Sequence, residues 1–121
     1  MKPEFEKLYE HAMEAFNNRD YENAERHFQQ ILNINANFAD ILTQLGIALR
    51  DKGQHDEAIK EFNKAKEVNP QYIPARLHLG ITYYSRGFYG LAEEEWRDAL
   101  AIDPKNSALK TYLNFVKPRN P

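Results

Sequence analysis

The chain has 121 residues, 28% of them charged, and a formal net charge of -2 at pH 7. This length suits one domain. The nearly balanced charge disfavours nucleic acid as a partner, because nucleic-acid binding requires a basic patch or stripe. The absence of cysteine excludes disulfides, iron–sulfur clusters and thiol chemistry.

No targeting or membrane segment is expected. The first ten residues are charged and lack the apolar core of a secretory signal. No stretch approaches the roughly 18 apolar residues of a membrane span. We therefore expect a cytoplasmic protein that does not insert into a membrane.

Seven helices are predicted, and residues that favour helix starts or ends bound most of them. Asp20 is a suitable N-cap for the second helix and Ser107 for the seventh. Gly53 and Gly87 can take the left-handed conformation that ends a helix. In chain order the expected helices cover residues 3–17, a segment after Asp20, 39–52, 55–68, Pro74 to Gly87, 89–102, and a segment that follows Ser107 and ends before Lys117. The connections are short, so consecutive helices should be antiparallel neighbours.

Residue types return at intervals of 34 positions along most of the chain. The recurring sets are Leu45-Gly46 and Leu79-Gly80; Pro70 and Pro104; Ala24, Ala58 and Ala92; and Phe28, Phe62 and Trp96. A fixed period of this size indicates a stack of repeats, in which no unit buries its apolar face alone.

The repeated pattern resembles that of the tetratricopeptide repeat (TPR) family. The second unit carries Leu42-x-x-Leu45-Gly46-x-x-Leu49, Ala58-x-x-x-Phe62 and Pro70. The third unit carries Arg76-x-x-Leu79-Gly80-x-x-Tyr83, Ala92-x-x-x-Trp96 and Pro104. The first unit is a weaker copy, with Ala36 in place of the proline.

The resemblance implies an all-α fold, a right-handed helical-repeat solenoid (TPR superhelix) of three helix pairs plus a C-terminal capping helix. Residues 1–121 are expected to form a single TPR domain. The expected repeats cover residues 5–38, 39–72 and 73–106, and the expected capping helix covers residues 107–117.

Polar residues predict where the stack stops. Three positions of the first helix in each pair should pack on a preceding unit. In the second pair they are apolar: Ile41, Leu45 and Ala48. In the first pair the equivalent residues are polar: Lys7, His11 and Glu14. The positions that should pack on a following helix are Leu42, Gly46 and Leu49 in the second pair and Lys110, Asn114 and Lys117 in the last helix. Polar surfaces at both ends are typical of capped solenoids, so we expect a monomer.

The resemblance also implies that the first helix of each pair lines a concave groove for a protein or peptide. The 34-residue phase assigns to this groove Tyr9, Met13, Phe16, Thr43, Gln44, Ile47, Arg50, Leu77, His78, Ile81, Tyr84, Tyr112 and Phe115. The set is mostly apolar and rich in aromatic residues, as interaction surfaces are. Two alternatives stay open. These residues could simply pack within the stack, or the chain could be a self-assembling scaffold that uses its ends or convex face.

Some TPR proteins bind acidic chaperone tails through lysine, asparagine and arginine in this groove. Here Tyr9, Met13, Gln44, Pro74 and His78 stand at those positions, so an apolar or amphipathic segment is the expected ligand.

No cofactor, metal site or catalytic centre is expected. The four histidines, His11, His27, His55 and His78, lack metal-ligand spacing, although His11 and His27 could approach each other across the first pair. Glu93, Glu94 and Glu95 splay around one helix instead of converging across a cleft, and therefore indicate a solvated face.

Overall fold

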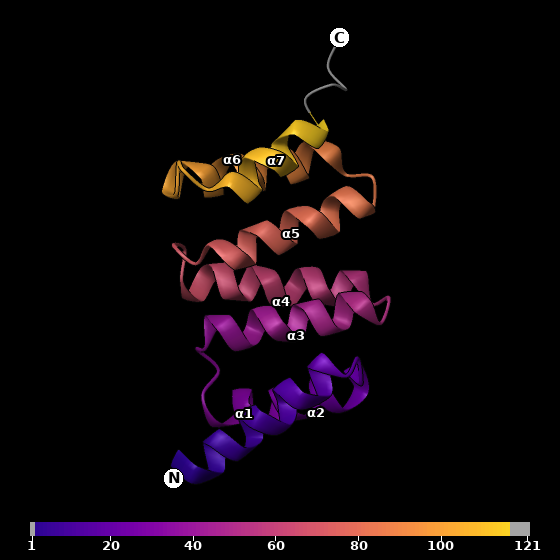
Figure 1. Ribbon diagram of the computed structural model, residues 1–121, viewed down its shortest axis with the longest axis vertical. Coiled ribbons are helices and arrows are strands. Elements are labelled where there is room, and N and C mark those ends of the chain that lie inside the picture. Colours follow the sequence, from indigo (N-terminus) through magenta and orange to yellow (C-terminus); the bar gives the residue numbers. More distant parts are fainter. Residues whose placement is uncertain (1, 117–121) are drawn as a thin grey trace.

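The computed structural model describes residues 2–116, with side chains from residue 4. Within this range the chain forms seven α-helices and no strands: α1 (Lys2–Asn17), α2 (Tyr21–Ile34), α3 (Ala39–Asp51), α4 (His55–Val68), α5 (Ile73–Ser85), α6 (Tyr89–Ile102) and α7 (Ser107–Val116). The helices follow one another as antiparallel pairs stacked along one axis, with α7 on the last pair (Figure 1). The predicted all-α repeat fold is confirmed. Lys117, the last residue of the expected capping helix, lies outside the described residues.

The helix ends follow local chemistry at most positions. The Asp20 carboxylate accepts a hydrogen bond from the Asn23 amide (3.4 Å), as predicted for an N-cap. Gly53 and Gly87 have φ of +91° and +87°, the left-handed conformation that ends α3 and α5.

The predicted cap of the last helix is wrong. Asn106 caps α7, because its Oδ1 accepts a hydrogen bond from the Leu109 amide at 3.0 Å. Ser107 is already the first residue of the helix. Hydrogen bonds from Asn106 to Asp103, through its amide and its side chain (3.1 Å each), fix Asn106 outside the helix. Two residues that favour capping stand side by side in the sequence, and the preceding turn decides between them.

Small residues let the helices of each pair approach closely. An added Cβ at Gly46 would lie 2.5 Å from the Phe62 ring, and one at Gly80 would lie 2.6 Å from Cε2 of Trp96. The Trp96 indole is held there by a hydrogen bond from its Nε1 to the Leu77 carbonyl (3.1 Å). A glycine inside a helix costs about 0.5–1 kcal/mol relative to alanine, and the buried ring that it admits offsets this cost.

The polar residues at the ends of the stack are exposed. Lys7, His11 and Glu14 face solvent on α1, whereas their equivalents in α3 are buried. At the other end Lys110 and Asn114 are exposed, whereas Leu42 and Gly46 at the equivalent positions are buried. The third predicted residue at that end, Lys117, is not among the described residues.

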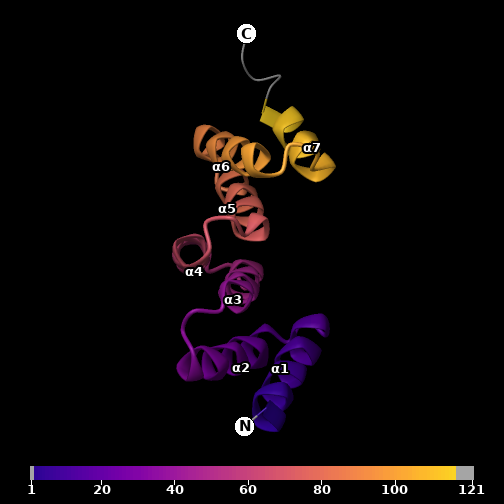
Figure 2. The same ribbon diagram turned by 90° about the vertical axis from the view of Figure 1, so that its left-hand side faces the viewer.

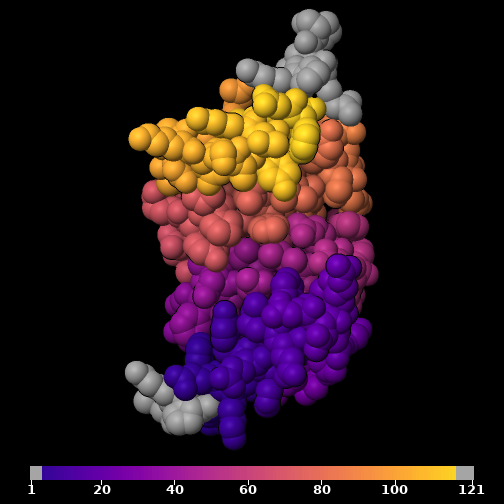
Figure 3. Space-filling model, viewed as in Figure 1, coloured from indigo at the N-terminus to yellow at the C-terminus, as the bar shows by residue number. Residues whose placement is uncertain are grey.

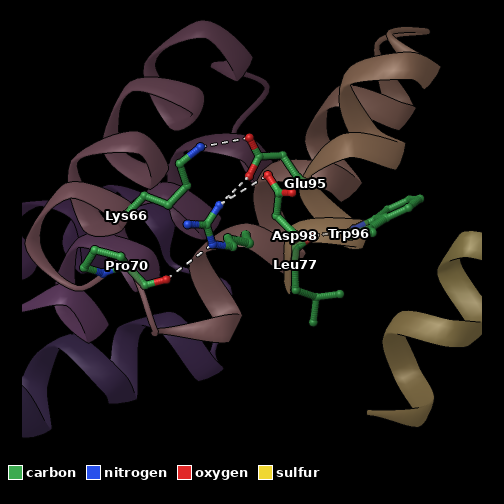
Figure 4. Close-up of polar contacts among 7 residues, drawn as sticks. Lys66, Pro70, Leu77, Glu95, Trp96 and Asp98 are labelled. Atoms are coloured by element: carbon green, nitrogen blue, oxygen red, sulfur yellow. Dashed lines mark hydrogen bonds and ion pairs between the residues drawn. The ribbon is translucent and has the colours of Figure 1, made fainter. Parts of the chain in front are cut away.

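Ion pairs join successive helix pairs, and one of them repeats with the 34-residue period. Lys52 contacts Glu22 (3.2 Å) and Glu25 (2.7 Å) of α2. One repeat later, Arg86 contacts Asp56 (3.6 Å). A half-buried network also connects the second and third pairs (Figure 4), in which Glu95 contacts Lys66 at 2.8 Å and Arg76 at 3.5 Å. Arg76 is held in place by the Pro70 carbonyl at 3.4 Å and by Asp98 at 4.0 Å.

Candidate binding face of the inner helices

Helices α1, α3, α5 and α7 lie on one side of the stack, and α2, α4 and α6 lie on the other (Figure 2). Seen from this direction, α1 and α7 project farther than α3 and α5, so the side formed by the odd-numbered helices is concave. Figure 3 shows this side from the front, with α1 near one end and α7 near the other. We call it the inner face. Its predicted residues are Tyr9, Met13, Phe16, Gln44, Ile47, Arg50, Leu77, His78, Ile81, Tyr84, Tyr112 and Phe115.

The middle of the inner face is half-buried, and its two ends are more open. Met13, Phe16 and Ile47 pack partly against the core of the first two pairs, and Leu77, Ile81 and Tyr84 pack partly against the core of the third. Tyr9 is 39% exposed and Phe115 is 50% exposed. Part of this face therefore belongs to the stack itself, and the remainder is an accessible apolar surface.

Thr43 does not belong to the inner face. Its side chain is 2% exposed, and its hydroxyl donates a hydrogen bond to the Ala39 carbonyl one turn earlier (2.8 Å). The repeat phase assigned both Thr43 and Gln44 to the groove, but adjacent helical residues point about 100° apart, and only one can lie at its centre. Gln44 is the less buried of the two. Its Oε1 is buried and has no hydrogen-bond partner within residues 2–116.

Aromatic rings form a continuous cluster at the α5–α7 end of the inner face. Tyr84 lies 4.8 Å from Tyr89 and 6.2 Å from Phe115, measured between ring centroids. Tyr112 stacks on Trp96 at 5.2 Å and meets Phe115 edge-on at 5.7 Å. Offset and edge-to-face contacts of this kind stabilise a rigid surface. The same stacking position is occupied one repeat earlier by His78 on Phe62 (6.1 Å).

Arg50 is the charged residue that the repeat phase assigned to the inner face. Its side chain is 17% exposed, and its Nη1 donates to Nδ1 of His78 at 3.1 Å. Burial of the imidazole and the adjacent guanidinium lower the pKa of His78 to about 4, and Asp51 opposes this shift. Because Nδ1 is the acceptor, the ring proton is on Nε2. His78 is therefore a neutral acceptor that orients Arg50.

Two of the remaining histidines lie close to each other. The rings of His11 and His27 approach each other at 5.6 Å, and Nδ1 of His27 is 2.8 Å from the Asn23 carbonyl. No group of three or more histidine or acidic side chains within the described part of the chain is arranged to hold a metal ion.

One exposed apolar pair lies outside the inner face. Phe88 and Leu91, at the turn between α5 and α6, are 50% and 45% exposed. The equivalent positions of the second pair are Gln54 and Glu57. The 34-residue comparison of turns contains this signal, because a polar position in one copy becomes apolar in the next.

The stacked helix pairs and the concave inner face define a helical-repeat solenoid of the kind that binds extended ligands. Sequence profiles then name the family: a profile described as "Tetratricopeptide repeat" matches residues 27–60, and one described as "TPR repeat" matches residues 46–87. The chain belongs to the tetratricopeptide repeat family. A comparison with curated protein sequences gave no match.

Solved structures share this fold over nearly the whole chain. The Yersinia enterocolitica type III secretion chaperone SycD, in complex with a peptide of the translocator YopD, superposes with a TM-score of 0.90 at 19% identity, covering 96% of this chain and 94% of that one. The Sgt2 TPR domain from Aspergillus fumigatus gives 0.88 at 25% identity, covering 97% and 79%. The first TPR of Spaghetti (RPAP3), bound to an HSP90 peptide, gives 0.88 at 16% identity, covering 95% and 91%. No helix among residues 2–116 is long and apolar enough to cross a membrane.

Proposed function

We propose that this protein is an adaptor that binds a peptide or helical segment of another protein on its inner face. The observation that carries the proposal is the accessible apolar surface between Tyr9 and Phe115, on helices whose rigidity comes from the stack.

Two structural relatives support the ligand class. SycD and the first TPR of RPAP3 share this fold and were solved with peptides bound. Binding is favoured over catalysis because the described inner face contains one strongly charged group, Arg50, and no converging pair of titratable side chains that could serve as acid and base. We place the adaptor in the cytoplasm, since a chain without cysteine is compatible with a reducing compartment.

The proposal is tested by selecting peptides that bind the wild-type protein from a displayed library and measuring their affinity for variants. Ile47→Glu or Tyr84→Ala should weaken binding about tenfold, or about 1.4 kcal/mol, while the fold is kept. Lys110→Glu, on the exposed outer side of α7, is the control and should bind as the wild type does. Equal affinity of all four proteins would contradict the groove.

A second candidate function is self-assembly through the turn that carries Phe88 and Leu91. Their exposure favours it, whereas the polar end surfaces favour a monomer. Light scattering distinguishes these possibilities, because a monomer has a mass of 14.2 kDa. We expect that mass at micromolar concentration. A dimer that Phe88→Gln dissociates would instead assign this turn to self-assembly.

A further inference from the structure

The charge at the centre of the inner face defines the partner more narrowly than its apolar residues do. We infer that the bound segment carries an internal aspartate or glutamate whose carboxylate pairs with Arg50, with apolar side chains on both sides of it. This inference rests on the proposed function and names the chemistry of its ligand.

Arg50 has more hydrogen-bonding capacity than its surroundings use. A guanidinium has five N–H donors, arranged to pair with a carboxylate through two parallel hydrogen bonds. Within the described residues Arg50 donates to His78 at 3.1 Å and contacts Asp51 through Nε at 3.5 Å. The contact with His78 is to a neutral ring, and the contact with Asp51 is long. A side chain that is 17% exposed is held largely away from water with its charge incompletely balanced.

The carboxylate that Arg50 contacts is that of Asp51, whose side chain is 35% exposed. The pKa of Tyr21 is raised by partial burial and by Asp51, while the guanidinium groups of Arg19 and Arg50 oppose the shift. A second carboxylate, supplied by a ligand, would complement a guanidinium that Asp51 contacts only at 3.5 Å.

Arg50 also occupies the last turn of α3, where a cation stabilises the helix dipole. An exposed side chain would suffice for that purpose. The contact of Arg50 with His78 on α5 instead fixes the guanidinium across the gap between the inner helices of the second and third pairs. Rigid placement lowers the entropy cost of each hydrogen bond to a ligand.

The position of Arg50 favours an internal carboxylate over a chain terminus. Helix α3 lies between α1 and α5, so accessible apolar residues flank Arg50 on both sides: Tyr9, Met13 and Phe16 from α1, and Ile81, Tyr84 and Phe115 from α5 and α7. A segment that ended at Arg50 would leave half of this surface uncovered. A segment that continues past Arg50 covers both halves and places its acidic residue between apolar ones.

The test is a selection of random 12-residue peptides, displayed with both ends linked to other residues, against the wild type and Arg50→Met. The strongest binder is then synthesised with its acidic residue and with the matching amide, and the affinities of both forms are measured by fluorescence anisotropy. The acid-to-amide change should weaken binding to the wild type about tenfold and leave binding to Arg50→Met unchanged, a coupling of about 1.4 kcal/mol. Arg50→Lys keeps the charge without the planar fork and should show a smaller coupling. Circular dichroism checks that both variants are folded.

Each outcome decides between the two proposals. One contrary result is that the selected peptides require Ile47 and Tyr84 and yet show no preference for an acidic residue; another is that they keep that preference with Arg50→Met. Either result overturns this inference and leaves the proposed groove intact. A free-ended library that enriches acidic residues only at the last position overturns the internal placement. Failure to enrich any peptide counts against the groove and this inference together.

Discussion

At the scale of single residues, two glycines determine how closely the helix pairs pack. Gly46 faces the Phe62 ring and Gly80 faces Trp96, with no room for a Cβ at either position. The sequence could predict this arrangement, because a costly residue in two equivalent helix interiors requires a packing reason. It could not predict the hydrogen bond from Trp96 to the Leu77 carbonyl, which depends on the rotamer that the assembled pair imposes.

Gly46→Leu should lower the free energy of unfolding by about 1–3 kcal/mol or more, because the new side chain overlaps Phe62. Asn114→Leu is the matched control, since it places the same side chain at the equivalent but exposed position of α7. Thermal and urea melts of the two variants check the repeat phase. Equal destabilisation would mean that α7 is not the solvent-facing end of the stack.

His78 should make stability depend on pH. Its pKa is lowered in the folded chain from 6.5 to about 4, so the unfolded chain binds a proton that the folded chain resists. The free energy of unfolding should therefore fall as pH is lowered through this window, by on the order of 3 kcal/mol in full. Urea titrations at pH 7 and pH 4.5 measure the loss, and His78→Gln should lose less stability between the two. An identical loss in both proteins would assign the pH dependence to other groups.

At the scale of elements, the helices follow sequence signals closely. The predicted bounds of α4 and α6 coincide with the observed ones, and α3 and α5 stop where Gly53 and Gly87 take positive φ. The N-cap of α7 was misassigned by one residue. The hydrogen bonds of Asn106 to Asp103, in the turn before the helix, select Asn106 over Ser107 as the cap.

Removing the cap of α7 should be measurable. Asn106→Ala should cost about 1 kcal/mol, because the Leu109 amide loses its acceptor. Ser107→Ala, one residue later and exposed, should be close to neutral. Chemical denaturation of both variants tests the assignment. A larger loss for Ser107→Ala would restore the cap that the sequence predicted.

At the scale of the whole molecule, stability depends on the junctions between helix pairs, since each unit of a solenoid contacts only its neighbours. The Glu95 network joins the second and third pairs through Lys66 and Arg76. The ion pair between Lys52 and Glu22 joins the first two helix pairs. The equivalent ion pair between Arg86 and Asp56 joins the second and third helix pairs. The basic members of the two ion pairs are 34 residues apart, and so are the acidic members, so the sequence already relates the two pairs.

Glu95→Ala should lower the free energy of unfolding by about 1–3 kcal/mol, because Lys66 and Arg76 lose a half-buried partner. Glu93→Ala is the control on the same helix, since Glu93 pairs with Arg97 within α6 and such pairs contribute about 0.3–0.5 kcal/mol. Urea denaturation compares the two. Similar small losses would show that the network contributes no more than a surface ion pair.

The sequence by itself determined the repeat, the seven helices, the close-packed glycines and the polar ends, because these depend on spacing and local chemistry that recur in each copy. It also assigned one side of each odd-numbered helix to the inner face. Only the tertiary structure decided which of those residues are accessible: Thr43 is buried, and Arg50 is fixed by His78. The physical reason is that a helical phase sets the direction of a side chain, whereas its burial, rotamer and partners depend on the neighbouring helix, which the phase does not describe.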